Sequence, residues 1–183
     1  ESSDRYETTK AFQVNEVDLG ETKLRMFDFG GDTVYHLSYQ MTIRDNYIPI
    51  VVINMQQFDE LLSSTDTKEA ARQLCMDYMS HLYLSCPRLG PPLLVLTHKD
   101  MLTPQRLRQR KQQLVDAVED LRLQILDEER RLSRDSSTYC TILHLALNDT
   151  AVFKHTDIFV FGADDIGDLN SLLTELSSRC KSN

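Results

Sequence analysis

A short polar segment in the first quarter of the chain has the residue types of a nucleotide switch. Asp28-Phe29-Gly30-Gly31 follows the strand-like run Leu24–Phe27. An aspartate at a strand end can hold a metal ion through water, and a glycine amide three residues later can face a phosphate oxygen, as in a D-x-x-G arrangement. A structural alternative stays open, because a Gly-Gly pair after a strand also forms a turn through the positive φ angles that glycine reaches.

Two further polar segments stand at the ends of later apolar runs. They are Thr97-His98-Lys99-Asp100 and Gly162-Ala163-Asp164. In chains that alternate strands and helices, ligands bind at the carboxyl ends of the strands, so we expect function at these three segments. For Asp100 a second interpretation is open, since its carboxylate could cap the helix that begins near Pro104.

Composition limits the class of protein. A chain of 183 residues is long enough for one domain with a core, and 41% hydrophobic with 26% charged residues is ordinary for a globular protein. The net charge of -8 argues against a nucleic-acid partner, whose binding surface is basic, and gives no support to an anionic membrane surface. No apolar run is long enough for a membrane span, and the polar start is not a signal peptide. We therefore expect a cytoplasmic protein.

The cysteines and histidines give no sign of a disulfide or a metal site. The four cysteines are far apart without a C-x-x-C pair, which predicts free thiols at Cys75, Cys86, Cys140 and Cys180. None of the five histidines forms a ligand-like pair with another.

The first half of the chain predicts a hairpin, a strand and a helix. Apolar and polar residues alternate over Ala11–Phe29 around Gly20-Glu21, which predicts a β-hairpin. The β-branched run Tyr47–Met55 predicts a strand buried on both faces, with Pro49 tolerated near its start. Thr67 is the expected N-cap of the following helix, whose apolar positions are Ala71, Leu74, Met79 and Leu82.

The second half continues the alternation. Leu93–Asp100 predicts a short buried strand, Tyr139–Leu147 and Asp157–Asp165 predict two more, and Ile166–Cys180 an amphipathic helix. Between them a long helix is expected from Thr103 to about Arg134, with Pro104 as its first residue. Its apolar stripe fits either the domain core, which we favour, or a dimer seam, and contains Leu107, Leu114, Val118, Leu121, Ile125 and Leu132.

The three polar segments, in this order on successive β-α units, resemble the guanine-nucleotide-binding G domain. Within it, the chain is most similar to the Roc (Ras of complex proteins) domain of the Roco family, which has D-F-x-G, an aromatic-rich stretch after it, and T-H-x-D in place of N-K-x-D. The resemblance implies an α/β fold: a Ras-like three-layer sandwich with a mainly parallel sheet and a β-hairpin edge. It also implies that residues 1–183 form a single G-like domain, part of a larger signalling protein.

The resemblance also implies roles for individual residues. Asp28 would bind Mg²⁺ through water, the Gly31 amide would contact the γ-phosphate, and Thr8 or Thr9 would be the switch threonine. Guanine would be read by the T-H-x-D segment and the segment after the last strand. There Asp100 would accept both ring N–H groups and the Ala163 amide would donate to the carbonyl oxygen, while Thr97 and His98 complete the base site.

Two departures from the family leave alternatives open. No phosphate loop of the form G-x-x-x-x-G-K-[ST] occurs in the 183 residues, and Asp32 stands where many GTPases have the glutamine that orients water. Either a longer protein binds GTP or GDP with Mg²⁺ and hydrolyses GTP slowly, or the chain is a pseudo-GTPase without cofactor that serves as a dimerisation or scaffold module. The family's first strand is also missing, and Thr141–Leu147 is the only spare strand to take its place.

Overall fold

The structure of the chain is a computed structural model, and it describes residues 12–19, 22–29, 42–44, 46–79, 82, 86, 89–90, 92–132, 158–162 and 166–182. The chain divides into two compact units, Glu1–Ile43 and Arg44–Asn183. That both units belong to one G-like domain stays a prediction.

The first unit contains the predicted hairpin. Strand β1 (Phe12–Leu19) pairs antiparallel with β2 (Thr22–Phe29), in a register that runs from Phe12 opposite Phe29 to Leu19 opposite Thr22. The alternation of apolar and polar residues therefore predicted the hairpin correctly. Its observed start, Phe12, is one residue after the predicted start.

The second unit is built on a parallel sheet with the order β3-β4-β5. Its strands are β3 (Ile50–Asn54), β4 (Leu93–Thr97) and β5 (Ile158–Val160). Strand β4 lies in the middle, and its residues Leu93–Leu96 are all buried, as the sequence predicted. The parallel pairing confirms an α/β fold for this unit.

The burial of strand β3 differs from the prediction. Val51 and Ile53 are buried, but Ile50 and Val52 on the other face are 36% and 61% exposed, so burial on both faces was wrong. The reason is position, because β3 pairs only with β4 among the described strands and therefore lies at the edge of that sheet. The spare strand expected to take the place of the family's first strand, Thr141–Leu147, lies outside the described residues.

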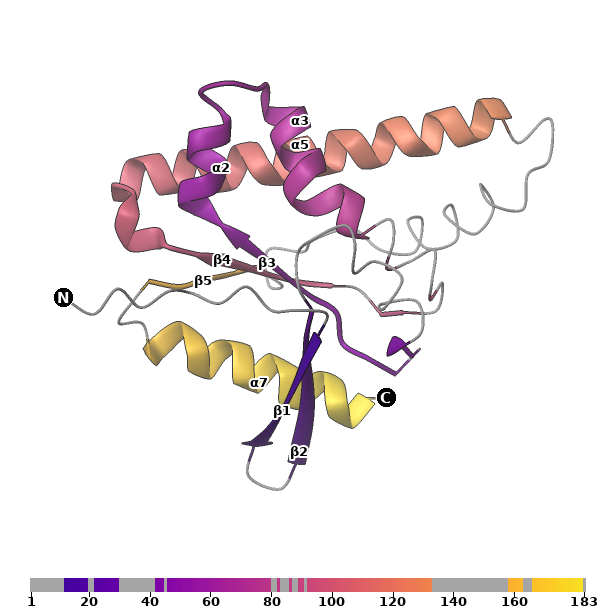
Figure 1. Cartoon of the computed structure of the whole chain (residues 1–183), viewed down its shortest axis with the longest axis vertical. Helices are drawn as coiled ribbons and strands as arrows, with labels where there is room; N and C mark the ends of the chain where they lie inside the picture. Colours follow the sequence, from indigo (N-terminus) through magenta and orange to yellow (C-terminus); the bar gives the residue numbers. More distant parts are fainter. Residues whose placement is uncertain are drawn as a thin grey trace. The chain divides into compact units, whose positions relative to one another are not determined.

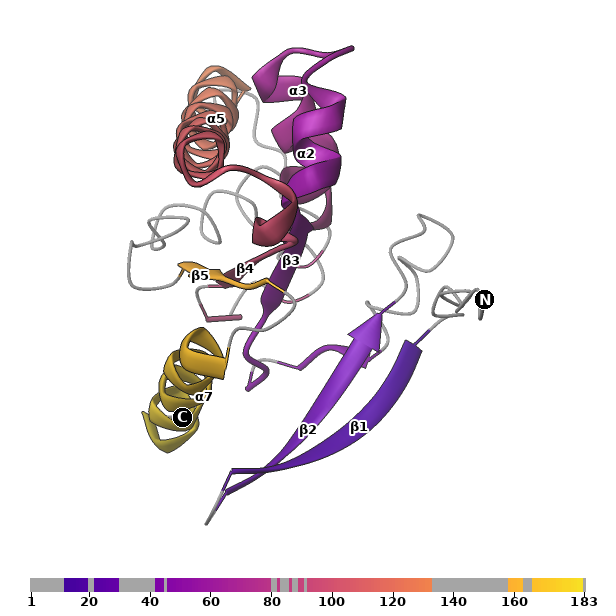
Figure 2. The same ribbon diagram turned by 90° about the vertical axis from the view of Figure 1, so that its left-hand side faces the viewer.

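Helices cover both faces of the parallel sheet (Figures 1 and 2). On one side lie α2 (Met55–Leu61), α3 (Thr67–Ala71), its continuation as the π-helix η2 (Arg72–Met76), and α5 (Pro104–Leu132). On the other side lies α7 (Ile166–Ser182), which contacts β5. Large side chains that are almost fully buried form the core of this unit: Ile53, Met55, Phe58, Met76, Met79, Leu93, Leu94, Leu96, Leu114 and Val118.

The starts of the first two helices differ from the prediction. Helix α2 was not predicted; it begins directly after β3, where the Asn54 side chain accepts hydrogen bonds from the amides of Gln56 and Gln57 at 3.0 and 3.2 Å. For α3 the N-cap is Asp66 and not Thr67, because Asp66 has extended backbone angles and its carboxylate accepts from the Glu69 amide at 2.9 Å.

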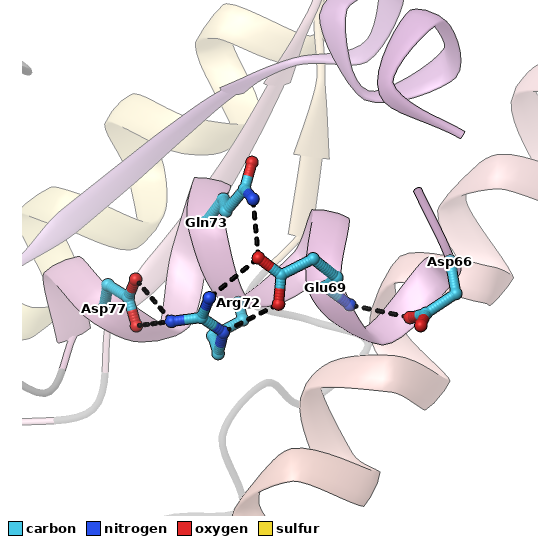
Figure 3. Close-up of polar contacts among 5 residues, drawn as sticks. All are labelled: Asp66, Glu69, Arg72, Gln73 and Asp77. Atoms are coloured by element: carbon cyan, nitrogen blue, oxygen red, sulfur yellow. Dashed lines mark hydrogen bonds and ion pairs between the residues drawn. The ribbon is translucent and has the colours of Figure 1, made fainter. Parts of the chain in front are cut away.

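A chain of polar contacts continues from this cap along the surface of α3 and η2 (Figure 3). The Glu69 carboxylate accepts from Arg72 at 2.7 and 2.9 Å and from Gln73 at 2.6 Å, and Arg72 also pairs with Asp77 at 3.2 Å. Hydrogen bonds from Arg72 and then Gln73 lower the pKa of Glu69. These contacts tie successive helical turns together at an exposed surface.

The long helix confirms its predicted start and its packing face. It begins at Pro104, and Thr103 Oγ1 accepts from the Arg106 amide at 3.3 Å. Leu114 and Val118 are 0% and 1% exposed. This burial confirms that they belong to the domain core, and the alternative that they form a dimer seam was wrong. Leu107 and Leu121 are half-buried, while the side chains of Ile125 and Leu132 lie outside those described.

The described cysteines are free thiols, as predicted: Cys75, Cys86 and Cys180. Burial raises the pKa of Cys75 to about 12, so this thiol is unreactive while the helix stays packed. Cys140 lies outside the described residues. Among the helices described, none has the length and apolar character needed to cross a membrane.

Candidate functional site

The carboxyl ends of β4 and β5 bring two of the predicted segments together. After β4 the chain forms the short 3₁₀-helix η3 (Lys99–Met101), and after β5 it continues through Phe161 and Gly162. The Phe161 amide donates to the Leu96 carbonyl at 2.7 Å, and the Lys99 amide donates to the Phe161 carbonyl at 3.1 Å. Segments more than sixty residues apart in the sequence therefore form one rim of the sheet.

Gly162 is in close contact with the Thr97–Asp100 segment. A Cβ added to it would lie 3.1 Å from Asp100 Oδ1 and 3.1 Å from Lys99 Cγ. The aliphatic part of Lys99 thus lies against the backbone that follows β5, and Lys99 is half-buried. Thr97 and Gly162 share a rim, as the alternation of strands and helices predicted.

His98 turns the chain at the end of β4. Its φ of 60° lies in the left-handed region, and within the described part of the chain it is the one residue other than glycine with a positive φ. Such a conformation costs on the order of 1 kcal/mol for a residue with a Cβ. The sharp turn makes it possible for the Lys99 amide to reach Phe161 on the neighbouring strand.

The hydroxyl group of Thr97 anchors this turn to the sheet. It donates to the Ile53 carbonyl of β3 at 3.4 Å, and it lies 3.0 Å from His98 Nδ1, which donates to it in the tautomer protonated at that nitrogen. Thr97 thereby connects the ends of β3 and β4 and restrains the His98 ring.

The Asp100 carboxylate is exposed, and no described residue donates a hydrogen bond to it. Thr103 caps α5 instead, so the interpretation of Asp100 as the helix cap was wrong. An exposed carboxylate held in a structured turn can accept two parallel N–H groups from a planar ligand.

The helix that follows this loop is fixed by an ion-pair cluster that the sequence analysis missed. Asp59 of α2 lies 2.7 Å from Arg110 Nε and 2.8 Å from both Nε and Nη2 of Arg106, and its side chain is 12% exposed. Burial raises the pKa of Asp59, but hydrogen bonds from Arg110 and Arg106 outweigh it, and the net pKa is lowered. A sign in the sequence was the spacing of Arg106 and Arg110, which places them on one helix face.

The described structure does not test the positions of the remaining predicted site residues. Asp28 is an exposed residue of β2 in the first unit, opposite Gln13, so its place beside Thr97 and Gly162 stays a prediction. The other four lie outside the described residues: Thr8, Thr9, Gly31 and Ala163. In the described ranges, no group of three or more His, Cys, Asp or Glu side chains could hold a metal ion.

Compared with protein families, with curated proteins and with solved structures, the chain matches none. The rim at the ends of β4 and β5 is therefore the main indication of function.

Proposed function

We propose that the chain is part of a Roc-type G domain that binds GTP and GDP as a switch and hydrolyses GTP slowly. The observation that carries the proposal is the meeting of the two predicted base-reading segments. The Lys99 amide bonds to the Phe161 carbonyl at 3.1 Å, and Asp100 lies against Gly162. A base bound at this rim would be contacted by residues from both segments.

The base is recognised by paired donors and acceptors. Asp100 offers two carboxylate oxygens, which match the ring N–H and the amino group on one edge of guanine. Adenine presents a ring nitrogen acceptor at the corresponding position, and two acceptors facing one another leave buried polar groups unpaired. The amide that follows Gly162, that of Ala163, would donate to the guanine carbonyl oxygen.

The phosphate side of the proposal depends on the first unit. The carboxylate of Asp28 at the end of β2 is a hard oxygen ligand of the kind that Mg²⁺ prefers, and it would hold the ion together with Thr8 or Thr9. A bound Mg²⁺ would neutralise phosphate charge. Contact of the Gly31 amide with the γ-phosphate would order the following segment in the GTP state only. The carboxylate of Asp32 would repel the γ-phosphate, and turnover is therefore slow.

A second candidate function is a scaffold or dimerisation module that binds no nucleotide. The observation in its favour is the edge strand β3, where Val52 is 61% exposed and Ile50 36%. Among the described strands β3 pairs only with β4, and exposed apolar side chains on an edge strand are typical of surfaces that bind another chain.

Titration with nucleotides separates the two functions. We expect Mg²⁺-GTP and GDP, but not ATP, to bind the chain with a dissociation constant of about a millimolar or weaker, because base contacts alone lack the charge-assisted bonds to phosphate. Calorimetry gives the constants, and NMR shifts of the Lys99 and Asp100 amides locate the binding. A micromolar constant would show that another segment supplies the phosphate site.

Asp100→Ala is the decisive variant. It removes the acceptor for two base N–H groups, which costs roughly 2–4 kcal/mol and abolishes the response to guanine nucleotides. Asp18→Ala is the matched control, because the substitution removes the same charge. The Asp18 carboxylate is exposed and lies 4.0 Å from its partner Lys23. Binding of GTP that survives Asp100→Ala contradicts the base-reading role, and a folded chain that ignores all nucleotides supports the scaffold function.

A further inference from the structure

Gly162 and Gly90 differ sharply in the space around them. At Gly162, a Cβ would lie 3.1 Å from Asp100 Oδ1, 3.1 Å from Lys99 Cγ and 3.4 Å from Lys99 Cε. At Gly90, nothing lies within 4 Å of the corresponding position. Contacts near 3.1 Å are tighter than ordinary van der Waals contacts, so a Cβ at position 162 requires the side chains of Asp100 and Lys99 to shift by a few tenths of an ångström.

We infer that Gly162 is a positioning residue for the Asp100 carboxylate, and that its missing side chain sets how Asp100 reads a base. The inference rests on the proposed function. No described residue donates a hydrogen bond to the Asp100 carboxylate, so the space that Gly162 leaves beside Asp100 Oδ1 decides where this carboxylate can lie. The aliphatic stem of Lys99 borders the same space, and the Lys99 amide is bonded to the Phe161 carbonyl.

Movement of the carboxylate weakens the binding of a base held through two hydrogen bonds more than that of a base held through one. Guanine offers a ring N–H and an amino group, and both must meet the two oxygens of Asp100 at hydrogen-bond distance. Hypoxanthine lacks the amino group and needs only one oxygen in place. A carboxylate displaced by a few tenths of an ångström or rotated therefore loses preference for guanine before it loses all affinity.

The test compares Gly162→Ala and Gly162→Val with the control Gly90→Ala in the full chain. We expect Gly162→Ala to shift the ¹³C signal of the Asp100 carboxyl group and to speed hydrogen exchange of the Lys99 amide about tenfold, with a larger effect for Gly162→Val. Gly90→Ala leaves both signals at their wild-type values. Titration with GMP and IMP then gives the guanine preference, which falls in the Gly162 variants.

The outcomes separate the inference from the proposed function. Unchanged Asp100 and Lys99 signals in Gly162→Ala overturn the positioning role, whether or not nucleotide binds. Equal losses for GMP and IMP overturn the effect on specificity, because a general loss of structure would weaken both ligands alike. If wild type shows no response to GMP while Gly162→Ala still shifts the Asp100 signal, the positioning role stands and the guanine-binding function fails.

Discussion

Asp59 and Asp100 are two aspartates beside the same loop, yet their surroundings are opposite. Asp59 is 12% exposed and accepts hydrogen bonds from Arg106 and Arg110 at 2.7 to 2.8 Å. Asp100 is exposed and receives no hydrogen bond from the residues that the structure describes. The first carboxylate accepts hydrogen bonds from the chain's own arginines and stabilises the fold, whereas the second is the one that we propose accepts the N–H groups of a base. The hydrogen-bond partners of the carboxylates, and not their charge, distinguish these two aspartates.

The largest expected effect on stability comes from Asp59→Ala. Removing this carboxylate leaves Arg106 and Arg110 without their shared acceptor, and we expect the free energy of unfolding to fall by roughly 2–3 kcal/mol. The Asp100→Ala variant serves as its counterpart and changes stability by less than about 0.5 kcal/mol. Urea unfolding followed by circular dichroism measures both. Equal losses in the two variants would break the contrast between them.

The pH dependence of stability sharpens the same contrast. The folded-state pKa of Asp59 lies below its unfolded value, so its contribution is complete above the unfolded pKa of about 4 and is lost as pH falls through the folded pKa. The stability difference between wild type and Asp59→Asn should therefore shrink on acidification below about pH 4. Chemical unfolding at a series of pH values measures it, and a difference that grows toward low pH would contradict the cause given for the shift.

Smaller effects are expected from the polar chain on α3 and η2. Asp66→Ala removes the helix cap and should cost about 1 kcal/mol, since the Glu69 amide loses its acceptor. Asp77→Ala removes only an exposed pair with Arg72 and should change stability by about 0.5 kcal/mol or less. The two variants are compared by thermal unfolding. A larger loss from Asp77→Ala would show that the network in Figure 3 acts as a unit.

The elements that the sequence predicted well are those whose signal is local. Alternation in the hairpin, the continuous apolar run of β4 and Pro104 at the start of α5 depend on neighbours in the chain, and the structure has each of them within a few residues. Helix α2 was missed because it is short and follows β3 without a loop. Burial of β3 was misjudged because exposure depends on which strands lie beside it.

The predicted site could be derived only in part for the same reason. The alternation of strands and helices placed Thr97 and Gly162 at one rim, as observed. The left-handed turn at His98, the packing of Lys99 on Gly162 and the Asp59 cluster depend on contacts between distant segments. The spacing of Arg106 and Arg110 places both arginines on one helix face, but no local pattern of residue types specifies which distant residue they contact.

The register of the two sheets sets an order of folding events. In the hairpin, Leu19 pairs with Thr22, so its strands can zip together within about 1–10 μs. In the parallel sheet, Ile50 pairs with Leu93 and Leu94 pairs with Ile158. Each pairing closes a long loop, and the chain loses conformational entropy before the stabilising contacts form. We therefore expect the rim that carries Asp100 and Gly162 to acquire its native geometry later than the hairpin.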